Sequence, residues 1–165
     1  MLAATNAIQP LDSKDRRILL LVQRDAKMAQ SEIARRVGLS TAAVNERLRK
    51  LENAGFIRRY TAVVDARALG LSVTAFVEVF IEHPRFEPAF IERALSLDEV
   101  LECHHITGEF SLLLKLRTRD MESLQHLLIH QLNALEGVRQ TRTVIALSTS
   151  KEESLVPTGV TEEKP

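Results

Sequence analysis

Apolar residues recur every three or four positions along the first third of the chain, which is typical of amphipathic helices. The expected helices cover residues 11–24, 31–37 and 40–53. Gly38, Leu39 and Ser40 separate the second helix from the third, since glycine readily ends one helix and serine caps the start of the next. Two helices joined by so short a turn predict a helix-turn-helix.

The third expected helix has one apolar and one polar side. Val44, Leu48 and Leu51 form the apolar stripe, so the opposite face is free to enter a DNA major groove. Gly55 ends this helix, and the run 56–64 that follows is rich in β-forming residues. We expect that run to be the strand of a wing beside the DNA backbone. A plain helical hairpin with a solvated face is the alternative, but it predicts neither the punctuated turn nor the wing.

The second half of the chain alternates between strand and helix patterns. Strands are expected at residues 71–81, 100–107, 110–117 and 138–148, with helices at 86–97 and 121–135. The order β-α-β-β-α-β is that of a ferredoxin-like sandwich, in which two helices cover one face of an antiparallel sheet. The predicted fold class is therefore α+β: a winged helix-turn-helix joined by a hinge to a ferredoxin-like βαββαβ domain.

The first strand of that domain indicates how the uncovered sheet face is used. One side of residues 71–81 is aliphatic, whereas the other side carries two aromatic residues. Such a face is unlikely to stay in water, and pairing with a second copy would cover it. The predicted dimer-interface residues are Thr74, Phe76, Glu78 and Phe80.

Charge divides the chain into the same two halves. Residues 1–65 hold 12 Lys and Arg against 7 Asp and Glu, and the remaining residues hold 10 against 15. The basic half is the one expected to meet a polyanion. The predicted segments are an N-terminal extension (1–10), a DNA-binding domain (11–64), a hinge (65–70), a second domain (71–148) and a mobile tail (149–165).

Targeting signals are missing from the sequence. No apolar run is long enough to span a bilayer, and the N-terminus lacks the pattern of a signal peptide. Cys103 is the single cysteine, which fits a reducing compartment. A cytoplasmic, nucleoid-associated protein without a membrane partner is expected.

Two motifs carry a resemblance to a known family. The first is LDSKDRRILLLVQRDAKMAQSEIARRVGLSTAAVNERLRKLENAGFIRRYTAVVD, and the second is ECHHITGEFSLLLKLRTRDM followed by GVRQTRTVIAL. In this order and spacing the chain resembles the leucine-responsive regulatory protein / asparagine-synthetase regulator (Lrp/AsnC) family over residues 11–148. The resemblance implies a regulator that binds double-stranded DNA, forms homodimers and higher oligomers such as octamers, and holds small amino-acid effectors between subunits.

The DNA-binding residues are expected on the second and third helices and the wing. Bases would be read by Thr41, Ala42, Asn45, Glu46 and Arg49, from a helix that Ser40 caps. Phosphates would be held by Arg35, Arg36, Arg47, Lys50, Arg58 and Arg59. Arg47 lies nearer the apolar stripe than Arg49, so a structural role that bridges helices is an alternative for it.

The effector site is expected at the turn between the second and third strands. In the family this turn reads Gly-Asp-aromatic-Asp, whereas here it reads Gly108-Glu109-Phe110-Ser111. A glycine turn leaves N–H groups free for a carboxylate, but a hydroxyl holds an ammonium less well than the family's second acid. An ordinary hairpin turn is the alternative. The predicted effector-binding residues are Thr107, Gly108, Glu109, Phe110, Ser111, Gln140, Thr141 and Arg142, with Thr143 beside them.

No catalytic constellation and no cofactor motif appears in the sequence, and neither a catalytic residue nor a metal site is predicted. Cys103, His104 and His105 cannot all face one ligand on a strand, and His126 and His130 lie opposite a leucine stripe. The predicted function is a sequence-specific transcriptional regulator that responds to a small molecule, an amino acid by resemblance. A nucleoid-organising protein with little effector response and an enzyme regulatory subunit are the alternatives.

Overall fold

The computed structural model describes residues 10–161, which form two compact units. Of the described residues, the first unit contains 10–63 together with 152–161, and the second contains 64–151. The predicted N-terminal extension, apart from Pro10, lies outside the described residues. Among residues 10–161, no helix combines the length and apolar character needed to cross a membrane.

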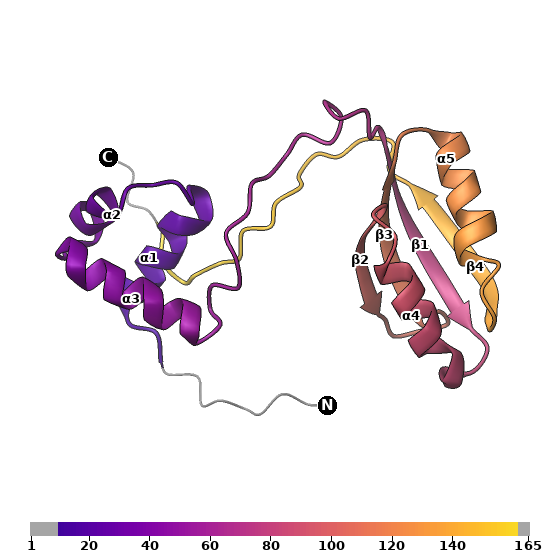
Figure 1. The fold of residues 1–165 in the computed structure, drawn as a ribbon, viewed down its shortest axis with the longest axis horizontal. Coiled ribbons are helices and arrows are strands. Elements are labelled where there is room, and N and C mark those ends of the chain that lie inside the picture. The colour runs from indigo at the N-terminus through magenta and orange to yellow at the C-terminus, as the bar shows by residue number, and fades with distance from the viewer. Residues whose placement is uncertain (1–9, 162–165) are drawn as a thin grey trace. The chain divides into compact units, whose positions relative to one another are not determined.

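Three helices build the first unit (Figure 1): α1 spans Ser13–Arg24, α2 spans Gln30–Val37 and α3 spans Thr41–Asn53. Their apolar stripes meet in one core, and the predicted α3 stripe of Val44, Leu48 and Leu51 is buried there. Leu39 and Phe56 pack against that core from the turn and from the segment after α3. The predicted helix-turn-helix is therefore confirmed.

The ends of these helices are held by the residue types that the sequence indicated. Asp12 caps α1 in a capping box with Asp15, whose backbone N–H donates to Asp12 Oδ1 at 2.7 Å. Gly38 ends α2 with φ 67°, a left-handed conformation in which glycine is unstrained. Ser40 caps α3 by accepting from the Ala43 N–H at 3.2 Å.

The prediction of a wing strand over residues 56–64 was wrong. Residues 58–65 have no helix or strand, and Tyr60, Val63 and Val64 are exposed. An extended run becomes a strand only when a neighbouring strand takes its hydrogen bonds. None lies beside this run within residues 10–161. The hinge that follows is a compact turn, in which Asp65 Oδ1 accepts from the Arg67 N–H at 2.9 Å.

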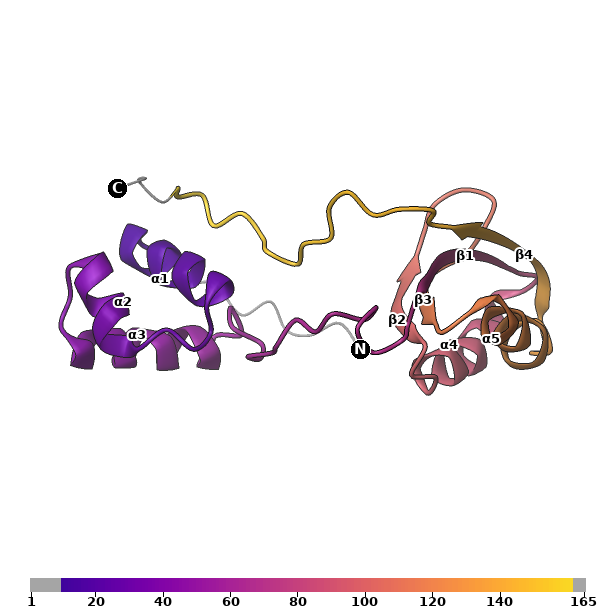
Figure 2. The ribbon, with the colours of Figure 1, turned by 90° about the horizontal axis from the view of Figure 1, so that it is seen from above.

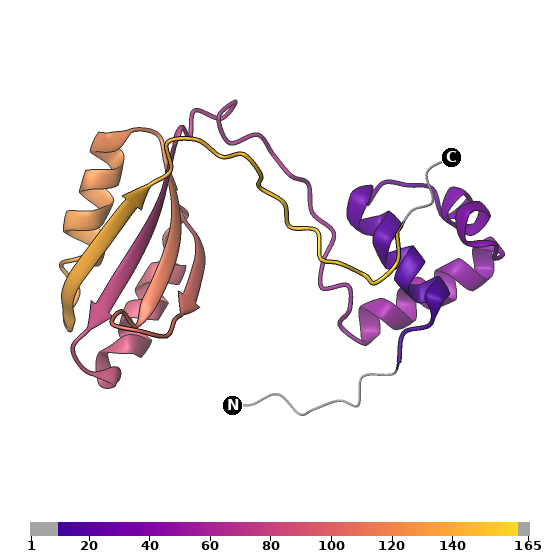
Figure 3. The ribbon, with the colours of Figure 1, turned by 180° about the vertical axis from the view of Figure 1, so that it is seen from behind.

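The second unit has the predicted strand and helix order. Its elements are β1 (Val73–Ile81), a 3-10 turn (Pro84–Phe86), α4 (Glu87–Leu95), β2 (Val100–His105), β3 (Leu112–Thr118), α5 (Met121–His126) continued by the π-helical η2 (Leu127–Leu132), and β4 (Val138–Ile145). The antiparallel sheet has the order β2-β3-β1-β4. Figure 2 shows α4 and α5 on the same side of this sheet, and Figure 3 shows the sheet from its other side.

The strict alternation along β1 is confirmed by burial. Ala75, Val77 and Val79 are fully buried on the helix-covered face, where they meet the leucines of β3. The pairing of Val77 with Leu114 places Glu78 opposite Leu113 on the uncovered face. Each fully buried aliphatic side chain contributes about 1.5–3 kcal/mol of burial free energy, so a register slip would be costly. The sheet is thus rigid enough to position residues on its uncovered face and at its loops.

The described C-terminal segment after β4 has no helix or strand, but its last part belongs to the first unit and packs on α1. Arg16 Nη1 on α1 donates to the Thr158 carbonyl at 2.9 Å. The sequence predicted only a mobile tail over residues 149–165, and this contact was not foreseen. Residues 162–165 lie outside the described part of the chain.

Candidate DNA-binding surface and effector loop

Arg47 links α3 to the start of α1. Its Nη1 lies 2.7 Å from Asp12 Oδ2 and 2.7 Å from Asp15 Oδ1. The hydrogen bond to Asp15 and then that to Asp12 raise the pKa of Arg47. The pKa of Asp12 is lowered, first by the Asp15 backbone N–H and further by Arg47. The structure therefore favours the structural role for Arg47 over the predicted phosphate contact.

Three of the other predicted basic residues are already paired within their helices. Arg35 and Arg36 on α2 both bind Glu32, whose Oε1 lies 2.7 Å from Arg35 Nη2 and 2.6 Å from Arg36 Nε. These hydrogen bonds, Arg35 first, lower the pKa of Glu32 to about 2. Lys50 Nζ lies 2.7 Å from Glu46 Oε1 one turn away on α3. Each of these cations is accompanied by a carboxylate, which reduces the net positive charge of the surface there.

The remaining predicted DNA-binding residues are exposed. Within residues 10–161, Arg49, Arg58 and Arg59 take part in no ion pair. Arg49 projects from the polar side of α3, and the two wing-segment arginines follow its end. The exposed neighbours of Arg49 on α3 and its cap are Ser40, Thr41, Ala42, Asn45 and Glu46.

Tyr60 was not predicted as part of the surface, but it fixes the segment that carries Arg58 and Arg59. Its hydroxyl donates to Glu52 Oε1 near the end of α3, at 2.8 Å. Burial first, and then this hydrogen bond, raise the pKa of Tyr60 to about 12. The only sequence signal for this contact is the placement of a tyrosine eight residues after a glutamate.

The predicted effector loop is an open glycine turn between β2 and β3. Gly108 has φ 117°, and a side chain added there would meet nothing within 4 Å. The loop is anchored by Ser111, whose N–H donates to the Val79 carbonyl at 2.9 Å and whose carbonyl accepts from Ile106 at 3.1 Å. In this part of the described chain, the N–H groups of Gly108, Glu109 and Phe110 make no hydrogen bond.

Arg142 on β4 joins the loop to the sheet. Its guanidinium lies 5.1 Å from the centre of the Phe110 ring, which is 6% exposed. It also forms an ion pair with Glu78 on β1, and the hydrogen bond to Glu78 raises its pKa, with a smaller effect from Glu109. The structure thus places Phe110 beside Arg142, and the charge of Glu109 is close enough to influence this guanidinium.

The strand register separates the other β4 candidates. Gln140 pairs with Phe80 and Arg142 with Glu78, so both lie on the uncovered sheet face. Thr141 pairs with Val79, whose side chain points to the helix-covered core, and Thr143 pairs with Val77 in the same way. Thr141 therefore lies on the opposite face from Arg142. Thr107 belongs to the exposed part of the loop.

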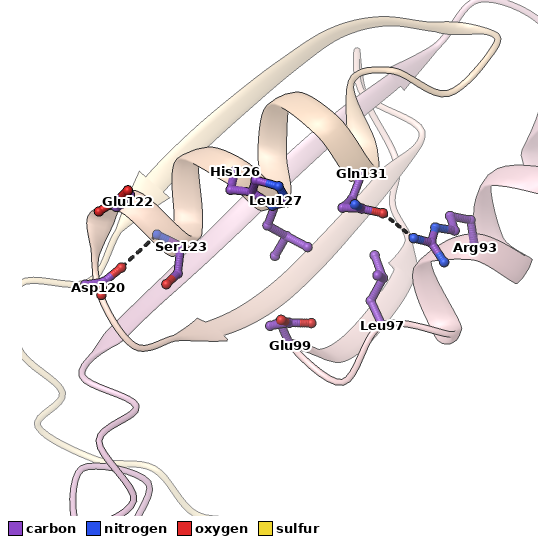
Figure 4. Close-up of a pocket in the computed structure, with 9 residues that line it drawn as sticks. All are labelled: Arg93, Leu97, Glu99, Asp120, Glu122, Ser123, His126, Leu127 and Gln131. Carbon is purple, nitrogen blue, oxygen red and sulfur yellow. Dashed lines mark hydrogen bonds between the residues drawn. The ribbon is translucent and has the colours of Figure 1, made fainter.

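A separate groove lies between α4 and α5 (Figure 4). Arg93 donates to Gln131 across it, and Asp120 caps α5 beside it, with Asp120 Oδ1 2.7 Å from the Ser123 N–H. None of the predicted effector residues lines this groove, and it does not include the 107–111 loop. The lining residues are Arg93, Leu97, Glu99, Asp120, Glu122, Ser123, His126, Leu127 and Gln131.

The histidines and the cysteine are dispersed. His104 contacts Glu102 and His105 contacts Glu87, at 3.2 and 3.3 Å between Nε2 and Oε2. Burial raises the pKa of the Cys103 thiol, which disfavours a thiolate ligand. Among residues 10–161 no three His, Cys, Asp or Glu side chains gather as a metal site would require.

Known protein families match both units of the chain. A family model described as a winged helix-turn-helix DNA-binding domain matches residues 11–58, and one described as the Lrp/AsnC ligand binding domain matches residues 74–156. The leucine-responsive regulatory protein of Escherichia coli K12 is 38% identical over 144 residues, which cover 86% of this chain and 88% of that protein.

Two further similarities cover nearly the whole length. The HTH-type transcriptional regulator FL11 of Pyrococcus horikoshii is 34% identical over 148 residues, or 90% of this chain and 97% of that protein. A transcriptional regulator from Neisseria meningitidis, solved as a complex with L-methionine, aligns with a TM-score of 0.86 at 30% identity and covers 90% of this chain and 97% of its own. With its helix-turn-helix and its βαββαβ domain in this order, the chain belongs to the Lrp/AsnC family of transcriptional regulators.

Proposed function

We propose that this protein is a transcriptional regulator that reads DNA with α3 and holds the DNA backbone with the segment after it. The observation that supports this proposal is that three arginines on this surface are exposed and unpaired within residues 10–161. Arg49, Arg58 and Arg59 are exposed and have no ion-pair partner among the described residues, whereas Arg47 is committed to α1. Unpaired arginines on a recognition helix and beside it are the groups that hold phosphates and guanines.

The salt dependence of DNA binding tests this assignment. A dimer that uses Arg58 and Arg59 of each subunit on the DNA backbone neutralises roughly four phosphates, so log K should fall against log salt with a slope of about −3.6. Glu32→Gln should steepen that slope, because it releases Arg35 and Arg36 from their shared carboxylate. A slope of log K against log salt near zero for the parent protein would contradict the proposal.

We further propose that the second unit binds an amino acid at the 107–111 loop. The three N–H groups that make no hydrogen bond in this loop would hold the carboxylate, as backbone N–H groups do in anion-binding turns. The Phe110 ring beneath Arg142 would form one wall of the site. The Neisseria regulator's complex with L-methionine supports an amino acid as the ligand class.

The ammonium of such a ligand would need a carboxylate other than the one at the family's last loop position. Ser111 stands there in this chain. Glu109 lies in the same loop, and its charge already influences Arg142. Glu78 is held by Arg142 and is 19% exposed, so it is less available. Glu109 is therefore the proposed partner of the ammonium.

Calorimetry with L-methionine and a panel of other amino acids tests the site. Gly108→Val should abolish binding, because a β-branched residue cannot adopt φ 117° without strain. Gly70→Val is the matched control, since Gly70 also has a positive φ and open surroundings but lies in the hinge. Ser111→Asp should strengthen binding. Equal losses in the two glycine variants, with no gain in Ser111→Asp, would place the effector site elsewhere.

A second function, a nucleoid-organising protein with little effector response, is favoured by Ser111 alone. In that case DNA binding would keep its salt dependence, and no amino acid would change it. The proposed setting is the cytoplasm, on the nucleoid, as a homodimer that assembles into higher oligomers. Its relatives are transcriptional regulators, and no catalytic role is proposed.

A further inference from the structure

The C-terminal segment 154–159 is here named the C-terminal strap. Side chains of α1 bind it through hydrogen bonds to its backbone. The Gln23 side chain pairs with Val156 in both directions: its Oε1 accepts from the Val156 N–H at 2.9 Å, and its Nε2 donates to the Val156 carbonyl at 3.2 Å. An amide side chain that satisfies both the N–H and the carbonyl of one residue recognises the backbone of the strap, as a neighbouring strand would.

A second pair of residues holds the strap two residues further on. Arg16 Nη1 donates to the Thr158 carbonyl at 2.9 Å, and Arg16 lies about two turns before Gln23 on the same helix. Gly159 follows with φ 77°, and a Cβ there would lie 3.3 Å from the same Arg16 nitrogen. A glycine is therefore the residue that permits both the turn and the close approach of the guanidinium.

The strap also covers part of the domain. Thr158 is 9% exposed, although residues 146–157 before it are mostly exposed. One groove of the first unit is lined by α1, by the strap and by residues 56–61, the segment that carries Arg58 and Arg59. The strap therefore shares a groove with the two arginines proposed to hold phosphates.

We propose that the C-terminal strap packs as part of the DNA-binding domain. The strap positions the 56–61 segment and so strengthens DNA binding. With the strap docked, the domain is joined to the rest of the protein by two segments of chain, and with the strap released it is joined by one. Release of the strap would loosen the domain and lower its affinity for all DNA sequences alike, since the arginines concerned meet phosphates and not bases. The effect on DNA rests on the proposed DNA-binding function, whereas the docking of the strap does not.

Two variants of the 165-residue chain separate the docking of the strap from its effect on DNA binding. Val156→Pro removes the N–H that Gln23 accepts, at a side chain that is 65% exposed, and Glu153→Pro makes the same chemical change at an exposed residue without such a bond. One lost hydrogen bond corresponds to about fivefold faster hydrogen exchange in α1 peptides around residues 16–23. Val156→Pro should show this increase and about fivefold weaker binding to specific and random DNA, whereas Glu153→Pro should show neither.

A third variant tests the strap by strengthening its packing on α1. Thr158 Oγ1 is buried without a hydrogen-bond partner in the described structure, so Thr158→Val should slow exchange in α1 by a few-fold. Unchanged exchange in both Val156→Pro and Thr158→Val would show that the strap is not docked in solution. Faster exchange in Val156→Pro with unchanged DNA affinity would show a docked strap without a role in binding DNA. Loss of DNA binding in every variant, the Glu153→Pro control included, would contradict the proposal as well.

Discussion

Arg47 on α3 forms an ion pair with Asp15 on α1, with 2.7 Å between Nη1 and Oδ1. The same nitrogen reaches Asp12, the residue that caps α1. One side chain of the recognition helix therefore holds the start of a second helix. This assigns Arg47 to the stability of the domain and leaves DNA contact to its neighbours.

Arg47→Ala should destabilise the first unit by about 1 kcal/mol, because the ion pairs are partly exposed and two carboxylates are left without their cation. A loss of this size lowers the melting temperature of a domain this small by roughly 4–8 °C. Calorimetric melting measures it, with Arg49→Ala as the control that should melt like the parent. An unchanged melting temperature in Arg47→Ala would contradict the structural role and favour a DNA contact for this arginine.

Arg49→Ala and Arg58→Ala should differ in their effect on sequence preference. Arg49 projects from the polar side of α3, so its loss should cost about 1–3 kcal/mol on the specific site and relax the preference for it. Arg58 lies in the segment after α3, so its loss should weaken specific and random DNA alike. Titrations of both variants on both DNAs decide the matter. Equal losses on the two DNAs for Arg49→Ala would mean that it holds only phosphate.

Phe76→Ser together with Phe80→Ser should convert the protein to monomers with intact secondary structure. Both side chains belong to the uncovered sheet face, where Phe76 is 36% exposed beside Val144, which is 54% exposed. Full burial of an aromatic ring contributes about 1.5–3 kcal/mol, so the interface would lose most of its apolar centre. Sedimentation measures the mass. Leu147→Ser is the control, because this residue is 96% exposed beyond the end of β4. A double variant that sediments like the parent would rule out this face as the interface.

Alkaline titration should report directly on the contact between α3 and the segment after it. Tyr60 is the single tyrosine, so the tyrosinate absorbance of the folded protein belongs to it alone. Its pKa is raised to about 12, first by burial and then by Glu52, above an unfolded value of about 10. Its contribution to stability is therefore complete below pH 10 and is lost as the pH rises toward 12.

Rapid pH jumps, read before the protein unfolds, give the titration midpoint of the folded state. Glu52→Gln should lower that midpoint only in part, because burial is the larger cause of the shift. Asp65→Asn is the control, since Asp65 caps the hinge turn and does not contact Tyr60. A midpoint near 10 in the parent would show that Tyr60 is not held against α3 in solution.

The sequence predicted those parts of the fold that local chemistry determines. Ser40 and Gly38 mark the turn between α2 and α3 because a cap and a left-handed glycine work within a few residues. The alternation along β1 predicted which side is buried, since a strand has a period of two. Four of the eight expected strand ends were displaced by two or three residues, because pairing across the sheet decides where a strand starts and stops.

The parts that could not be predicted depend on contacts between distant positions. Residues 56–64 have the composition of a strand, but composition cannot supply the partner that a strand needs. The pairing of Arg47 with Asp12 and Asp15 joins positions more than thirty residues apart, so helical periodicity left it only as an alternative. The contact of Gln23 with Val156 spans 133 residues, in a segment without periodicity. Alternation along β4 already puts Thr141 and Arg142 on opposite faces, but only the register with β1 shows that Arg142 takes the uncovered one.

The binding of the strap to α1 also has a consequence for proteolysis. A few hydrogen bonds suffice to dock the strap because it belongs to the same chain as α1, so docking is an intramolecular step. A single cut within the exposed residues 147–153 would turn the strap into a free peptide, and at micromolar protein such a peptide would diffuse away. One nick outside the helices would thus act as an irreversible release of the strap, without removing any residue of α1, α2 or α3.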